Sequence, residues 1–163
     1  MRFISRKIGN KKERAIIKEI KSYGFQVFWV RGRFSRYSQF EDNTEIEGNS
    51  VTKTALALTT KLFFDDGDVF ESVVVSLEAI RNAKKTNPHD TIIHTLIHEL
   101  AHVIQIREKS LILDEPDLFN KSHGIRFCEI YTDLICKYDV KYIDFNYYIG
   151  ELEQLPPEIE RRN

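Results

Sequence analysis

Two histidines lie four residues apart in the sequence, His98 and His102, and a glutamate, Glu99, directly follows the first. Four residues make slightly more than one helical turn, so on a helix both imidazoles project from one face with Cβ atoms about 5–6 Å apart. Both rings can then bind one metal ion, and neutral imidazole nitrogens are typical zinc ligands. Zinc with an open position lowers the pKa of its water to about 7, and Glu99 is placed to act as general base. The pattern therefore predicts a catalytic zinc site.

A site of this kind needs a third protein ligand, and the residues offer two candidates, His123 and Glu129. His94 is not expected to be a ligand, because three positions at i, i+4 and i+8 span about 12 Å of helix axis while zinc bonds are near 2.1 Å, and it is interpreted as a supporting or solvent-facing residue. His123 lies one turn before Phe127, on the side of a second helix that would pack against the first. Glu129 lies about 120° away from that side. The angle favours His123 and leaves Glu129 as the alternative.

The helix that carries the histidine pair is expected over residues 88–107. Asn87 can cap it, Pro88 suits its first position, and Asp90 lies near the positive end of its dipole. On a helical wheel the apolar residues gather on one side and the histidines on another. The sequence thus predicts a helix with a packing face and a separate ligand face.

The remaining elements follow from hydrophobic periodicity and turn residues. They are a helix over 11–23 ended by Gly24, a strand over 25–30, a loop over 35–50, strands over 54–64 and 69–77, a short helix over 77–85 and an amphipathic helix over 122–138. Asp65 to Asp68 includes an Asp-Gly step, which supplies the positive φ of a tight hairpin. The order predicts an α+β domain with a small antiparallel or mixed sheet packed on the two ligand-bearing helices.

Length and composition suit one folded domain: 163 residues, 42% hydrophobic and 30% charged. No apolar run reaches the roughly 20 residues of a membrane span, and the first residues lack the apolar centre of a signal peptide, so a cytoplasmic protein without membrane contact is expected. Cys128 and Cys136 are expected in one helix about 12 Å apart, too far for a disulfide, and are interpreted as core residues. The oligomeric state is not indicated.

Charge is distributed unevenly along the chain. Residues 1–36 hold eleven lysines and arginines against two glutamates, a net charge of +9, and the rest hold thirteen against twenty-three, a net charge of −10. A basic third can contact nucleic acid by releasing counterions from phosphates, or dock on the protein's own acidic part. We expect residues 1–36 to belong to the same domain as a catalytic core over 37–150, with a tail over 151–163.

The segment from His98 to His102, followed by His123-Gly124-x-x-Phe127, resembles the SprT-like zinc metallopeptidases, which combine HExxH with an HGxxF-type third histidine. Residues 73–77 resemble the strand before the active-site helix of that family, and the resemblance extends over about 54–138. It implies a compact zincin-like core with Zn²⁺ held by His98, His102 and His123, Glu99 as catalytic base, and a protein or peptide substrate running antiparallel along an edge strand.

Two features of the sequence bear on this resemblance. The chain has no C-x-x-C pair, so the cysteine-rich zinc ribbon of many relatives has no counterpart in it. Near His123, the side chains of Arg126, Tyr131 and Asp133 are candidates to support the ligands or stabilise an oxyanion. The sequence therefore predicts a zinc metalloendopeptidase. The alternative is a catalytically silent, peptidase-like module that binds protein or nucleic acid and keeps a structural zinc.

Overall fold

The computed structural model describes residues 2–37, 55–86, 92–110 and 123–140. Over these residues it contains four α-helices, one 3-10 helix and three strands. In chain order they are α1 (Lys11–Ser22), β1 (Gln26–Val30), η1 (Phe34–Arg36), β2 (Ala57–Phe63), β3 (Val69–Ser76), α3 (Leu77–Thr86), α4 (Ile92–Arg107) and α5 (Ile125–Lys137). The predicted α+β class is confirmed.

The sheet is mixed and has the order β1-β3-β2. β3 pairs in parallel with β1 and antiparallel with β2, so that Val73 lies opposite both Val27 and Thr59. The predicted hairpin joins β2 to β3, and Gly67 takes the positive φ of 88° that its turn requires. Within the described part of the chain, β3 is the only strand that pairs with β2, so β2 is an edge strand, and it also contacts α4.

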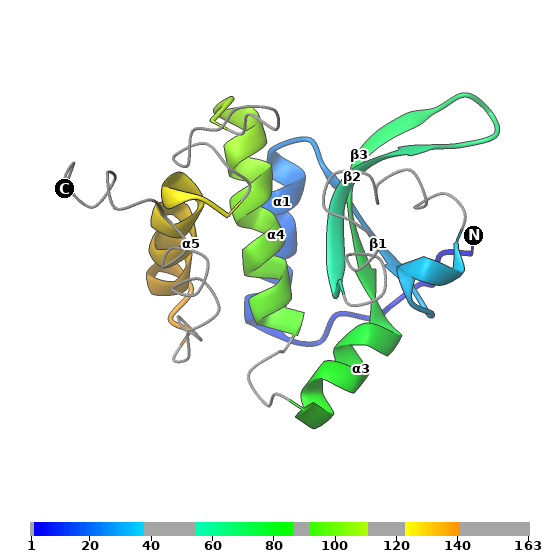
Figure 1. Cartoon of the computed structure of the whole chain (residues 1–163), viewed down its shortest axis with the longest axis horizontal. Coiled ribbons are helices and arrows are strands. Elements are labelled where there is room, and N and C mark those ends of the chain that lie inside the picture. The colour runs from blue at the N-terminus through cyan, green and yellow to red at the C-terminus, as the bar shows by residue number, and fades with distance from the viewer. Residues whose placement is uncertain (1, 38–54, 87–91, 111–122, 141–163) are drawn as a thin grey trace, which may run out of the picture.

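Helix α4 occupies the centre of the domain. Figure 1 shows α5, α4 and the sheet following one another across the molecule, with α1 beside α4, and α4 contacts α1, α5 and β2. Leu96, Leu100 and Val103 are fully buried, and so is the polar Gln105. The sequence predicted one packing face on this helix, but α4 is buried on several sides because α1, α5 and β2 all contact it.

The side chains of β3 alternate between two hydrophobic clusters. Val73 and Val75 point toward the helices and join the main core, which also contains Phe127 of α5. Val74 points to the opposite face of the sheet, where it packs with Phe34. This alternation is the period-two pattern of a strand buried on both faces, and it places the main core directly under α4.

The helix ends agree with their sequence signals. The Asn10 side chain accepts a hydrogen bond of 3.1 Å from the Glu13 backbone N–H at the start of α1. Gly24, with φ 85°, follows the end of that helix, as predicted. Ser76 Oγ accepts a hydrogen bond of 3.1 Å from the Ala79 N–H, so the last residue of β3 caps α3. These residues mark both ends of α1 and the start of α3.

Some expectations differ from the structure or lie outside its described residues. η1 occupies the first residues of the predicted 35–50 loop, and the rest of that loop lies outside the described residues, as do the proposed helix start at Pro88 and the 151–163 tail. The interpretation of both cysteines as core residues is wrong for Cys136, which is exposed, while Cys128 is half-buried. None of the described helices is long and apolar enough to cross a membrane.

Candidate metal centre

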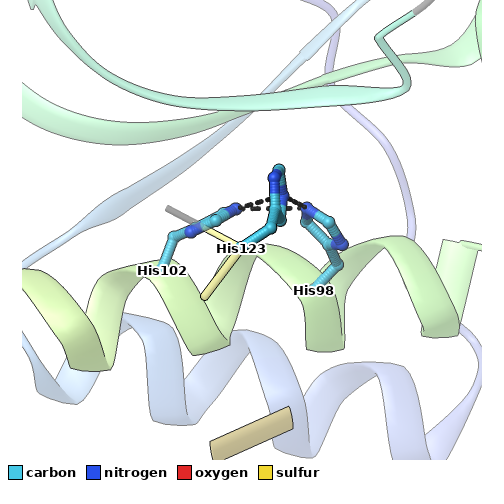
Figure 2. Close-up of side chains that lie close together, drawn as sticks. All are labelled: His98, His102 and His123. Atoms are coloured by element: carbon cyan, nitrogen blue, oxygen red, sulfur yellow. Dashed lines mark hydrogen bonds between the residues drawn. The ribbon is translucent and has the colours of Figure 1, made fainter. Parts of the chain in front are cut away.

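Three histidines from two elements converge beside α4. His98 and His102 project from successive turns of α4, and His123 lies two residues before the first residue of α5. The Nε2 atoms are 3.1 Å apart for His98 and His102, 3.1 Å for His98 and His123, and 3.2 Å for His102 and His123. Figure 2 shows the three rings pointing at one another. The structure thus brings together the three residues that the sequence proposed as ligands.

The spacing of these nitrogens fits a small divalent ion. Tetrahedral zinc with bonds of about 2.1 Å needs ligand nitrogens about 3.4 Å apart, close to the separations here. A point about 2.1 Å from all three Nε2 atoms lies about 1 Å to one side of their plane, where a pyramidal three-ligand site would hold its ion. Three neutral imidazoles also match the donor type that zinc prefers. The geometry and the donors therefore both suit zinc.

The electrostatics of the cluster keep the rings neutral. Burial lowers the pKa of His102 to about 3, with repulsion from His123 adding to the effect, and lowers the pKa of His123 to about 4. The pKa of His98 lies well below its ordinary value for the same first reason, with repulsion from the other two rings. Neutral imidazoles carry the lone pairs that metal binding requires.

Phe127 packs against all three histidine rings. Its ring centroid is 5.0 Å from that of His98, 4.6 Å from that of His102 and 4.9 Å from that of His123, and its side chain is fully buried. Tyr131 stacks on Phe127 at 5.7 Å. The predicted supporting residue Tyr131 is thus a buried part of this aromatic packing, 6.3 Å from the His98 ring. Phe127, four residues after His123, thus packs α5 against α4 at the histidine cluster.

Glu99 is held between α4 and the edge strand β2. Its carboxylate is buried and accepts a hydrogen bond of 2.6 Å from Thr59 Oγ1, and the Thr59 backbone N–H donates to it as well. Burial raises the pKa of Glu99 to about 7, and the two hydrogen bonds from Thr59 oppose that rise. The carboxylate predicted as general base therefore has a fixed orientation at the sheet edge.

The other candidates lie apart from the cluster. Glu129 is exposed and pairs with Arg126 at 3.0 Å, and it is not among the residues whose ligand atoms converge. Arg126 also forms two hydrogen bonds to Glu108, of 2.7 and 2.9 Å, which engage its guanidinium at the surface. Asp133 is exposed, and His94 lies outside the cluster. Neither of the charged residues proposed to support catalysis, Arg126 and Asp133, belongs to the histidine cluster.

Two residues beside the site were not predicted. Thr59 contacts Glu99 from forty residues earlier in the chain, and no local pattern could reveal that contact. Gln105 lies 3.1 Å from His102, between Gln105 Oε1 and His102 Nδ1. For Gln105 a signal existed, because it is a polar residue three positions after a proposed ligand, on the same helical face.

Comparison with known proteins adds no relative: the chain matches no protein-family model, no curated protein and no solved structure. The resemblance to SprT-like metallopeptidases therefore remains a prediction from the motifs. Fold and site by themselves define an α+β domain whose central helix carries two members of a three-histidine cluster.

Proposed function

We propose that the protein is a zinc-dependent metallopeptidase. The observation that carries the proposal is the convergence of three Nε2 atoms within 3.2 Å of one another, two of them from α4, the helix that also carries the buried Glu99. Zinc held by three neutral imidazoles supplies a Lewis acid for a carbonyl group and lowers the pKa of a coordinated water to about 7.

The chain's own residues have separate roles in this reaction. His98, His102 and His123 hold the ion. Glu99 accepts the proton of the water that attacks the scissile carbonyl, and it returns this proton to the nitrogen of the leaving amine. Thr59 keeps the carboxylate in place through its hydroxyl and its backbone N–H. This division of roles supports hydrolysis of an amide bond.

The position of β2 favours an extended polypeptide as the substrate. β2 is an edge strand within the described residues, and its residue Thr59 contacts Glu99. Peptides commonly add to exposed sheet edges through backbone hydrogen bonds. A substrate strand along β2 would pass the carboxylate of Glu99 with its own backbone extended. This arrangement supports a protein or peptide substrate over a small molecule.

The histidine site is tested by zinc titration of the full chain. We expect the protein to bind a single zinc ion. His123→Ala removes a ligand, so it should weaken zinc binding more than the loss of a residue that only supports a ligand, which typically costs about 10–100-fold. Chelation should abolish cleavage of an unfolded protein such as casein, and zinc should restore it. His94→Ala, on the same helix but outside the cluster, serves as control. Equal zinc affinity in His123→Ala and the unaltered protein would contradict the site.

A basic face on α1 favours nucleic-acid contact as a separate, second candidate. Four exposed basic residues recur every three or four positions, at Lys11, Arg14, Lys18 and Lys21. The two acidic residues of α1 are engaged elsewhere, Glu13 with Arg6 and Glu19 with Lys137. The acidic side chains of α1 therefore do not neutralise the basic face.

Binding of a short DNA duplex at several salt concentrations tests this face. Four phosphate contacts predict that log affinity falls with log salt with a slope of about −3.6. Replacing Lys18 and Lys21 with Gln should make the slope shallower by about 2 and leave peptide cleavage unchanged. Affinity that does not depend on salt would exclude the contact, and a zinc-loaded protein that binds DNA but cleaves no peptide would favour the silent module.

A further inference from the structure

Gln105 is a polar side chain buried in an apolar environment. It lies in the last turn of α4, three residues after His102, and is fully buried. Its neighbours on the same helix, Ala101 and Val103, are fully buried apolar residues of the main core. Burying an amide costs free energy unless the amide is hydrogen-bonded. The contact with His102 supplies a hydrogen bond, and the question is what this bond does for the histidine.

The contact determines which nitrogen of His102 carries the proton. Gln105 Oε1 lies 3.1 Å from His102 Nδ1, and an amide oxygen can only accept a hydrogen bond. His102 Nδ1 must therefore be the donor. A neutral imidazole has one N–H, so Nε2 then presents a lone pair. Nε2 is the atom that lies 3.1 Å from His98 Nε2 and 3.2 Å from His123 Nε2.

The opposite orientation of the amide would have the opposite effect. If the NH₂ group of Gln105 faced His102, Nδ1 would have to accept and Nε2 would carry the hydrogen. That hydrogen would point between His98 and His123, where a metal ligand must present a lone pair. Of the two orientations, only the one with Oε1 toward Nδ1 is compatible with metal binding by His102.

We infer that Gln105 is a positioning residue that holds His102 in its Nδ1–H tautomer and directs the Nε2 lone pair toward the metal position. The inference rests on the proposed zinc site. Residues that hold the second nitrogen of a histidine ligand raise its basicity and fix its ring, and their loss typically costs about 10–100-fold in metal affinity. Gln105 acts through His102 and contacts neither substrate nor ion.

Two substitutions separate this role from a packing role. Gln105→Leu keeps the volume and removes the acceptor, so zinc affinity measured by chelator competition on the full chain should fall about 10–100-fold. Gln105→Glu keeps an acceptor oxygen and should bind zinc within a few-fold of the unaltered protein or more tightly. In the metal-free protein the ranking of the two variants should reverse. Gln105→Leu should unfold at a higher temperature than Gln105→Glu, because leucine suits the apolar surroundings better than a carboxyl group does. A residue that only packs would give the same order in both measurements.

Val103→Ala is the matched control, since it removes buried side-chain volume from the same turn of α4 without changing an acceptor. It should lower thermal stability and leave zinc affinity unchanged. Long-range ¹H–¹⁵N spectra should show the Nδ1–H tautomer of His102 in the unaltered protein and its loss in Gln105→Leu. Equal zinc affinity of Gln105→Leu and the unaltered protein, or an Nε2–H tautomer in the latter, would overturn the role of Gln105 while the zinc site stands. Absence of zinc binding by the unaltered protein would overturn both proposals.

Discussion

Glu99→Gln should leave zinc bound and reduce peptide cleavage by about 10²–10⁴-fold, the usual contribution of general acid–base catalysis. Glutamine has the shape of glutamate, and its amide oxygen can still accept the hydrogen bond from Thr59 Oγ1, so the packing between α4 and β2 is retained. The amide cannot accept the proton of the attacking water. The loss should therefore appear in kcat while the zinc content, measured by elemental analysis, stays at the level of the unaltered protein.

The matched control for this variant is Glu129→Gln. Glu129 was the alternative third ligand, yet it is exposed and pairs with Arg126 rather than with the histidines. Its replacement should change neither zinc content nor cleavage. Loss of zinc in Glu129→Gln would restore it as a ligand. Full cleavage by Glu99→Gln would remove Glu99 from the mechanism.

The parts of the site that could be predicted from sequence are those that depend on local geometry. His98 and His102 share a helical face because of the 3.6-residue period, and this relation holds in any context that keeps the helix. His123 was proposed because it lies four residues before Phe127, on the buried side of the helix predicted over 122–138. In the structure α5 begins at Ile125, so His123 precedes the helix, and its approach to α4 depends on how α5 packs. Only the relation between His98 and His102 follows from the spacing within one element.

The parts that could not be predicted depend on contacts between elements. The hydrogen bond from Thr59 to Glu99 requires β2 to lie at the sheet edge next to α4, and strand order is not encoded in the alternation of residues within a strand. Arg126 could be assigned to the site or to the surface until the structure showed its pairs with Glu108 and Glu129. The helical wheel of α4 indicated one packing face because it takes no account of α1 and α5 on its other sides.

Because α4 is buried on several sides, the polar residues that it contributes to the site are buried too, which costs free energy unless they are hydrogen-bonded. Glu99 and Gln105 are buried together with Leu100 and Val103. Each polar group has a hydrogen-bond partner, Thr59 for Glu99 and His102 for Gln105, as buried polar groups require. The central helix thus contributes both to the core and to the site, and a substitution in the aromatic contact beneath the histidines should affect both.

Phe127→Ala tests whether the core and the histidine site depend on each other, and among the variants proposed it should lower stability the most. Removing a fully buried phenylalanine typically lowers the free energy of unfolding by about 3–5 kcal/mol. Because the Phe127 ring lies within 5.0 Å of the centroids of all three histidine rings, its loss should also let those rings rotate, and zinc affinity should fall about 10–100-fold. Urea unfolding of the metal-free protein measures the first effect and chelator competition the second.

Phe25→Ala separates the two effects. Phe25 belongs to the same buried cluster, but its ring lies under the guanidinium of Arg107, and the described contacts include none between it and a histidine. The Phe25→Ala variant should lose about as much free energy of unfolding as Phe127→Ala. It should keep the zinc affinity of the unaltered protein when binding is measured under conditions in which the variant is folded. Phe127→Leu, which keeps more of the volume, should give a smaller loss of stability together with measurable zinc weakening. If Phe25→Ala weakened zinc binding as much as Phe127→Ala does, the effect would reflect loss of the fold, and Phe127 would have no specific role in orienting the histidines.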